Sequence, residues 1–177
     1  NAALVGHARR TAILAKEIAV RLALPEEEQK ICEAAGLLMD SGILGYPDTF
    51  AKKQAEQMDA VERALWQKHP LLGQVSLKRI KCLEPIGQII RSHHEHFDGN
   101  GFPDRLKGEM IPLPSQIVAV SDYFDLLLNP PLAIGRVSVT QALNVLEKER
   151  GKRFDPVVVH ALGEIIEKVQ ETITSHE

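Results

Sequence analysis

The sequence predicts a single all-α domain, because apolar residues return at three- and four-residue steps along most of the chain. No segment sustains the alternation of apolar and polar residues that is typical of a strand. The 177 residues are enough for one domain with a substantial core, and there is no internal repeat or low-complexity tract. We therefore expect one helical bundle over residues 1–177, with about seven helices and one long loop.

The first two helices have the clearest patterns. The first should bury one face, formed by Leu4, Ala8, Ala12, Ala15, Ile18, Ala19 and Leu22. Pro25 and the three glutamates after it are a typical helix start, since proline fits the first turn and acids face the positive end of the helix dipole. This second helix runs toward Met39. Glycines and a proline then predict a loop from Ser41 to Pro47.

Two further helices are expected in the middle of the chain. One runs from about Met58 to Ile80 and is bent or broken near Pro70, because proline cannot donate the helical hydrogen bond. The other opens at Pro85 and ends near His94. Three large residues of the former are spaced for the core rather than for a substrate platform: Val61, Leu65 and Trp66.

A loop rich in glycine and proline is expected from Glu95 to Pro114, and loops of this length in compact domains are usually functional. Helical spacing returns from Ser115 to Leu128 and stops at an Asn-Pro-Pro sequence. The last two helices are expected from about Val139 to Arg150 and from Pro156 onward, with Asp155 as the N-cap.

Composition and charge exclude several classes of protein. A net charge of −3 and a pI near 6.2 do not favour nucleic acid or an anionic membrane as the partner. No stretch approaches the roughly 18 unbroken apolar residues of a membrane span, and the beginning does not read as a signal peptide. Cys32 and Cys82 stand alone, as expected of reduced cysteines in a cytoplasmic protein. Because the first residue is Asn1, we expect a fragment of a longer chain.

Six potential metal ligands lie at or near the ends of the predicted helices: His7, Asp40, His69, His93, His94 and Asp122. Imidazoles mixed with carboxylates suit iron, manganese or zinc, whereas calcium and magnesium prefer oxygen ligands. Adjacent histidines cannot share one helix face, so His93 and His94 need a helix end to reach one centre. Taken alone, the pair is equally compatible with one packed and one exposed histidine.

The segment from His93 to Pro103 reads His-His-Glu-His-Phe-Asp-Gly-Asn-Gly-Phe-Pro. It resembles the signature of the HD-GYP family, His-His-Glu-x-x-Asp-Gly-x-Gly-Tyr-Pro, with Phe102 in place of the tyrosine. Further matches follow in the family's order over nearly the whole chain, in residues 34–40, 68–73, 106–113, 117–125 and 154–156. So many short matches in one order identify the chain as a member of this family.

The resemblance implies a cytoplasmic bacterial signalling domain of the kind that follows a receiver or other sensor domain. Active members hydrolyse cyclic di-GMP with two or three metals, usually iron or manganese. The resemblance assigns one metal to three histidines and a second to a histidine and an aspartate, with Asp40 bridging: His69, His93 and His94 in the first set, His7 and Asp122 in the other. The implied partners are cyclic di-GMP or other signalling proteins, with a homodimer as a further option.

Asp40 and Asp98 are the carboxylates that we assign to catalysis on this resemblance. The expected substrate side of the site is the loop containing Glu95, Gly99, Gly101, Phe102 and Pro103. Its glycines would let the backbone approach the site closely, and its proline would stiffen the loop. Whether the two acids of this loop orient the histidines or only shape the loop stays open.

Four departures from the family pattern weaken the catalytic equipment. Met39 stands where the family has the histidine of its His-Asp pair, and a thioether is a weak ligand for iron or manganese. Ile43 replaces a lysine that faces the substrate phosphate. The Arg-Pro-Tyr-Arg stretch expected after Asp125 is absent, and Ala3 replaces a glutamate that some members use for a third metal. We therefore expect one metal position to be more secure than two.

Three functions follow from this balance. The favoured hypothesis is a degenerate HD-GYP output domain with weak or no turnover, which signals by binding nucleotide or protein partners. An active cyclic di-GMP phosphodiesterase, yielding linear dinucleotide or GMP, is the first alternative. A phosphohydrolase acting on another nucleotide is the second.

Overall fold

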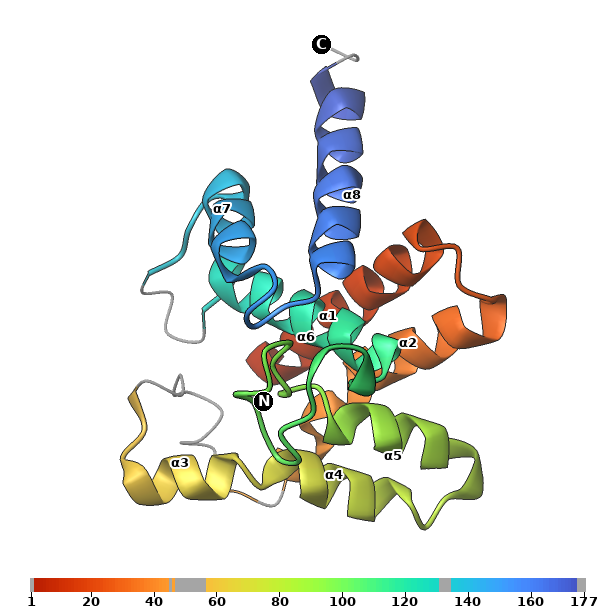
Figure 1. The fold of residues 1–177 in the computed structure, drawn as a ribbon, viewed down its shortest axis with the longest axis vertical. Coiled ribbons are helices and arrows are strands. Elements are labelled where there is room, and N and C mark those ends of the chain that lie inside the picture. Colours follow the sequence, from red (N-terminus) through yellow and green to blue (C-terminus); the bar gives the residue numbers. More distant parts are fainter. Residues whose placement is uncertain (1, 45, 47–56, 131–134, 175–177) are drawn as a thin grey trace.

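The all-α prediction is confirmed by the computed structural model, which describes residues 2–44, 46, 57–130 and 135–174 (Figure 1). Within these residues there are eight α-helices and three short 3₁₀ helices, and no strand is longer than a single bridge between Arg150 and Phe154. None of the described helices is long and apolar enough to cross a membrane.

The helices are numbered in the order in which they follow one another along the chain. They are α1 (Ala2–Arg21), α2 (Glu26–Leu38), η1 (Met39–Ile43), α3 (Ala60–Trp66), α4 (His69–Leu77), η4 (Lys81–Leu83), α5 (Glu84–Arg91), η5 (Gly108–Met110), α6 (Leu113–Leu128), α7 (Val139–Glu149) and α8 (Pro156–Thr174). Asp155 caps α8 as expected, since its carboxylate accepts from the backbone N–H of Val157 at 2.6 Å.

Several boundaries differ from the sequence-based expectations. The expected loop from Ser41 begins inside η1, and its residues Gly45 and Pro47 lie outside the described part of the chain. The break expected near Pro70 is confirmed, because this proline occupies the first turn of α4, where its missing N–H needs no partner. For the same reason Pro114 belongs to the first turn of α6 rather than to the preceding loop.

The core interpretation of α3 is wrong for its three large residues. Val61 is 70% exposed and Leu65 is 37% exposed, whereas Trp66 is half-buried against the histidines described below. A turn at residues 67–68 separates α3 from α4. In the described chain, α3 has no buried residue. Helical spacing alone could not reveal this, because a seven-residue helix is too short to identify its own inner face.

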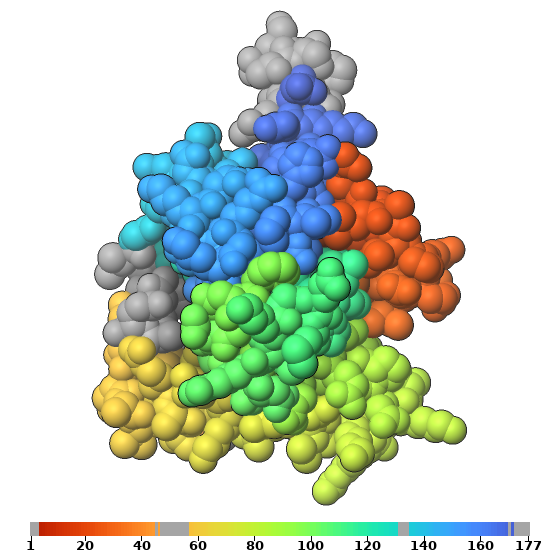
Figure 2. Space-filling model, in the orientation of Figure 1, coloured from red at the N-terminus to blue at the C-terminus, as the bar shows by residue number. Residues whose placement is uncertain are grey.

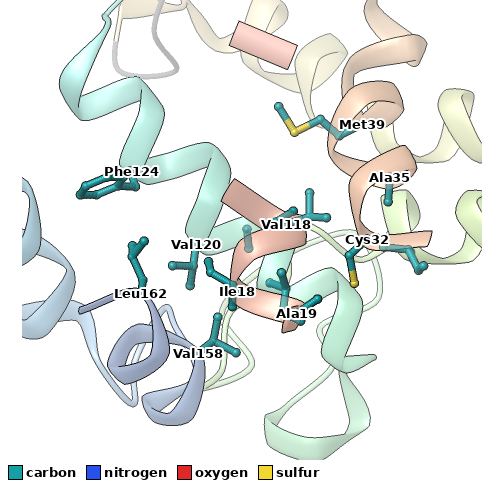
Figure 3. Packing of buried hydrophobic residues seen from close by; sticks show 14 of the residues in the cluster. Ile18, Ala19, Cys32, Ala35, Met39, Val118, Val120, Phe124, Val158 and Leu162 are labelled. Carbon is teal, nitrogen blue, oxygen red and sulfur yellow. The ribbon is translucent and has the colours of Figure 1, made fainter. Parts of the chain in front are cut away.

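The core lies where α1, α2 and α6 meet, and the first half of α8 packs against it (Figures 1 and 3). The middle of α6 is buried on almost all sides, including Val118, Val120 and Phe124. Met39, at the junction of α2 and η1, is 1% exposed and belongs to this apolar cluster. The chain therefore uses this position for packing.

Two glycines allow η1 to lie directly on α4. A Cβ atom at Gly42 would come within 2.0 Å of the His69 carbonyl oxygen and 2.8 Å of the Gly73 nitrogen. A Cβ atom at Gly73 would come within 2.9 Å of the Ile90 side chain. This close approach of backbones sets the distance between Asp40, on η1, and His69, on α4.

Replacing Gly42 with alanine should therefore lower the free energy of unfolding by about 3 kcal/mol, because the new methyl group meets backbone atoms that cannot rotate away. Gly163→Ala is the matched control: nothing lies within 4 Å of its Cβ position in α8, and alanine there should stabilise by about 0.5 kcal/mol. Denaturant unfolding monitored by circular dichroism measures both. Equal stabilities of the two variants would contradict this role for Gly42.

Candidate metal centre

The fold brings together six side chains that lie up to 115 residues apart in the chain. They come from five elements or turns: His7 from α1, Asp40 from η1, His69 from the start of α4, His93 and His94 from the turn after α5, and Asp122 from α6. All but Asp40, which is half-buried, are buried. The six predicted ligands thus line one interior site.

Three histidines form the tightest part of this site. One ring nitrogen from each of His69, His93 and His94 lies within 4.8 Å of the other two, and all three residues are buried. The neighbouring pair achieves this because α5 ends at Arg91, so that the backbone turns before His93. The expectation that adjacent histidines need a helix end is met by this geometry.

The hydrogen bonds of two of these rings fix their tautomers. The Nδ1 atom of His69 lies 2.7 Å from the carbonyl oxygen of Trp66, and that of His93 lies 2.5 Å from the carbonyl oxygen of Ile90. A carbonyl only accepts, so in both rings the proton is on Nδ1 and the Nε2 atom has a bare lone pair. These two Nε2 atoms are only 3.3 Å apart. Two lone pairs this close repel each other, and a shared cation would remove the repulsion.

The protonation of these rings supports the same conclusion. Burial lowers the pKa of both His69 and His93 to about 4, and burial together with the neighbouring imidazoles lowers the pKa of His94 well below its ordinary value. All three rings are therefore neutral near pH 7. Neutral imidazole is the form that binds metals, so the donor set fits a divalent cation such as iron, manganese or zinc.

Asp40 lies between this histidine cluster and the rest of the site. Its Oδ1 atom is 3.7 Å from Nε2 of His69, and its Oδ2 atom is 3.9 Å from Nε2 of His7. Burial, followed by the charge of Asp122, raises its pKa. One carboxylate oxygen thus faces each half of the site, which is the position that a bridging ligand requires.

The second half of the site is already paired. His7 contacts Asp122 through Nε2 at 3.0 Å and Asp125 through Nδ1 at 2.7 Å. Burial alone would lower the pKa of His7, but hydrogen bonds to these two carboxylates and the charge of Asp40 raise it to about 10. Both of its ring nitrogens therefore have anionic partners within the protein.

Two residues of this half were not assigned a role from the sequence. Asp125 is 2% exposed and accepts two hydrogen bonds from Arg10, at 2.6 and 3.0 Å, and one from Asn129 at 2.9 Å. It holds the His7 ring in place, as carboxylates behind metal-binding histidines commonly do. A signal was available: Asp125 follows Asp122 by one helical turn, and Arg10 follows His7 by one turn.

Met39, which precedes Asp40, does not contribute to the site as a replacement ligand would. Its side chain packs in the apolar core and is 1% exposed. Ile43, at the end of η1, is half-buried and offers neither charge nor a hydrogen bond. At the two positions of η1 where the family has a histidine and a lysine, this chain therefore has apolar side chains, Met39 and Ile43.

The loop after the histidines is held by Glu95. This carboxylate is 3% exposed and accepts from the backbone N–H groups of Asp104 at 2.6 Å and Leu106 at 3.1 Å. Gly101 packs so tightly below it that a Cβ atom would lie 2.2 Å from the backbone nitrogen of His96. Of the two roles left open for Glu95, the observed contacts are those of a loop-forming residue.

The other residues of this loop differ in whether they contact the candidate metal ligands. Asp98 accepts from the backbone and side-chain nitrogens of Asn100, both at 2.9 Å, and thereby closes a turn around Gly99, whose φ is +89°. No contact links Asp98 to the six candidate ligands in the described chain, so its catalytic role stays a prediction. Phe102, followed by Pro103, stacks on the His94 ring with centroids 5.0 Å apart.

Trp66 completes an aromatic wall around one histidine. Its ring centroid lies 4.7 Å from that of His94 and 5.4 Å from that of Phe102. Aromatic rings on two sides of His94 restrict its motion and exclude water from it, which contributes to its lowered pKa. Trp66 is thus part of the support of the site rather than of the hydrophobic core.

Several known proteins are similar to this chain in sequence. The HD domain profile matches residues 1–158. The cyclic di-GMP phosphodiesterase response regulator RpfG of Xanthomonas campestris is 37% identical over 147 residues, which are 82% of this chain and 39% of RpfG. The 3′3′-cGAMP-specific phosphodiesterase 2 of Vibrio cholerae is 32% identical over 160 residues, which are 89% of this chain and 30% of that enzyme.

Solved structures agree with the sequence comparison. The HD-GYP-like protein Bd1817 of Bdellovibrio bacteriovorus superposes with a TM-score of 0.78 at 20% identity, over 93% of this chain and 52% of Bd1817. A cyclic GMP-AMP specific phosphodiesterase of V. cholerae, V-cGAP3, superposes with a TM-score of 0.72 at 25% identity, over 91% of this chain and 44% of V-cGAP3. The chain spans between about a third and a half of the length of these relatives.

The chain belongs to the HD domain family and is of the HD-GYP type. It is related to cyclic di-GMP and cGAMP phosphodiesterases. Phosphohydrolases of this family bind divalent metals, and the buried histidine cluster is suited to that role.

Changing Glu95 to glutamine tests its structural role. An amide offers one accepting oxygen, so one of the two backbone N–H groups would face an NH₂ group, and the free energy of unfolding should fall by about 2 kcal/mol. Asp98→Asn, in the half-exposed turn, should lower the free energy of unfolding less than the Glu95 variant does. Denaturant unfolding of both variants measures the difference, and a larger loss for the Asp98 variant would refute this reading of the loop.

Proposed function

We propose that this chain is a metal-binding HD-GYP signalling domain that binds a cyclic dinucleotide and hydrolyses it slowly or not at all. The observation that carries the proposal is the pair of unprotonated Nε2 atoms of His69 and His93, 3.3 Å apart beside His94. Such a cluster needs a cation. The names of the relatives, which act on cyclic di-GMP or 3′3′-cGAMP, supply the substrate class.

Four residues would hold the secure metal: His69, His93, His94 and Asp40. A divalent metal bound there would supply Lewis-acid chemistry toward a phosphodiester. The protein's own contribution is positional. Backbone carbonyls fix two imidazoles, Phe102 and Trp66 enclose a third, and the half-buried Asp40 faces both halves of the site.

Slow turnover follows from what the η1 side of the site lacks. Phosphodiester hydrolysis develops negative charge in the transition state, and removing one preorganised donor costs about 10²–10³ in rate in a well-studied enzyme. Met39 places a core side chain where the family has a ligand, and Ile43 places an apolar one where it has a cation. The His7 half is meanwhile paired with Asp122 and Asp125.

An active cyclic di-GMP phosphodiesterase is the second candidate, because His7, Asp122 and Asp40 still line the second half of the site. The two candidates differ in the number of metals that they require. Hydrolysis of another nucleotide is the third candidate, because the name of the V. cholerae relative gives 3′3′-cGAMP as its substrate.

Metal content distinguishes these candidates. Protein purified anaerobically without a histidine tag should contain about one iron or manganese per chain by elemental analysis. His93→Ala should lose that metal, whereas His160→Ala, on the exposed surface of α8, should retain it. Two metals per chain would favour the active phosphodiesterase, and no metal in the wild-type protein would refute the proposal.

Restoring the missing groups tests the cause of slow turnover. The double variant Met39→His, Ile43→Lys should hydrolyse cyclic di-GMP about 10²-fold faster than the wild-type protein, because it regains one ligand position and one cation. Product formation is measured by chromatography, with circular dichroism to verify folding. A folded double variant with an additional metal but unchanged turnover would show that the loss lies elsewhere.

A further inference from the structure

One arginine beside the metal centre has no role in the site described so far. Arg153 lies in the α7–α8 connection, and the central carbon of its guanidinium group is 4.2 Å from the centroid of the Tyr123 ring and 5.3 Å from that of Phe154. Tyr123 directly follows Asp122 in α6. Stacking on these rings therefore holds the guanidinium group near the ligand side of α6.

The backbone around Arg153 is fixed against the loop that follows the histidines. Its carbonyl oxygen accepts from the N–H of Phe97 at 3.1 Å, and the preceding carbonyl, of Lys152, accepts from Asp98 at 2.8 Å. Figure 2 shows the two segments in contact, with the α7–α8 region in blue directly above the green loop. Phe154, 2% exposed, anchors the next position in the core. The backbone position of Arg153 is thus fixed relative to the loop that follows the histidines.

Arg153 also lines a narrow cleft that reaches the metal ligands. The cleft is lined by His93, His94, Glu95, His96, Ala119, Asp122, Arg153 and Phe154. It is too narrow to enclose a ligand group, so a group held by Arg153 would lie across its opening. There a cation and metal-binding imidazoles meet, together with the carboxylates of Glu95 and Asp122.

The charge of Arg153 has no counter-ion in the described chain. Its guanidinium group forms no hydrogen bond or ion pair there, although it is half-buried. Arg10 and Arg91, by contrast, each make two hydrogen bonds to one aspartate, Asp125 and Asp104 respectively. A partly desolvated cation of this kind is stabilised by an anion.

We propose that Arg153 binds a phosphate group of the cyclic dinucleotide across the opening of the cleft beside His94. The inference rests on the proposed function. A guanidinium group can donate two parallel hydrogen bonds to a phosphodiester, and its stacked position preorganises it for this contact. The site would therefore recover, from the α7–α8 side, part of the positive charge that it lacks at Ile43.

The test is binding of cyclic di-GMP to the metal-loaded chain, measured by isothermal titration calorimetry. Arg153→Ala should weaken binding about 10- to 100-fold, as loss of a charged hydrogen-bond pair does, and leave metal content unchanged. Arg153→Lys should bind with intermediate affinity, because the charge stays but the paired donors are lost. Arg150→Ala, an exposed neighbour paired with Glu147, is the matched control and should bind as the wild-type chain does.

Equal affinity of the wild-type chain and Arg153→Ala, at equal metal content, would overturn the assignment. If the metal-loaded wild-type chain binds neither cyclic di-GMP nor 3′3′-cGAMP, the proposed function fails separately, and inorganic phosphate becomes the probe. Phosphate binding that Arg153→Ala loses and Arg150→Ala keeps would still support an anion site at Arg153. Phosphate binding that is absent, or equal in all three chains, would remove it.

Discussion

The two Nε2 lone pairs of His69 and His93, facing each other at 3.3 Å, are the interaction on which the arrangement of the site depends. Their repulsion is sustained because each ring is fixed from behind by the backbone carbonyl three residues earlier, at Trp66 and at Ile90. Much of the surrounding structure serves to keep these helix ends together. Gly42 lets η1 lie on the start of α4, and Glu95 closes the loop that follows the histidines. Because metal binding would relieve the repulsion only in the folded chain, it should be coupled to folding.

The two halves of the site differ in how completely the protein satisfies them. His7 has carboxylate partners on both ring nitrogens, and Asp125 is in turn bound by Arg10, so this half is self-contained. In the histidine cluster, the Nε2 atoms of His69 and His93 face each other, and no donor is paired with either of them among the described residues. The packing of Met39 into the core reinforces the difference, because the backbone next to Asp40 is anchored by an apolar contact. A preference for one metal over two follows from this asymmetry.

Sequence periodicity was sufficient for most helices, whereas the six candidate ligands were chosen by residue type and by the family resemblance. The convergence of His93 and His94 was also predictable, since only a helix end allows it. Other features depend on tertiary neighbours. Val61 and Leu65 have helical spacing but are exposed, because α3 is a short helix with no buried residue in the described chain. The role of Arg153 depends on backbone pairing between segments more than 50 residues apart, which no local pattern records.

The distribution of charge around the site connects binding with slow turnover. Arg10 is neutralised by Asp125, and Ile43 contributes no charge, so among the arginines next to the ligands Arg153 is the one left to attract an anion. A cation that contacts a phosphate equally well before and during reaction strengthens binding without accelerating the chemical step. Faster hydrolysis would need donors that act on the charge developing in the transition state, and the η1 side that should supply them is apolar. On these proposals the domain keeps the elements that hold a cyclic dinucleotide and has lost those that cleave it, which suits a protein that reports the presence of the nucleotide more than its removal.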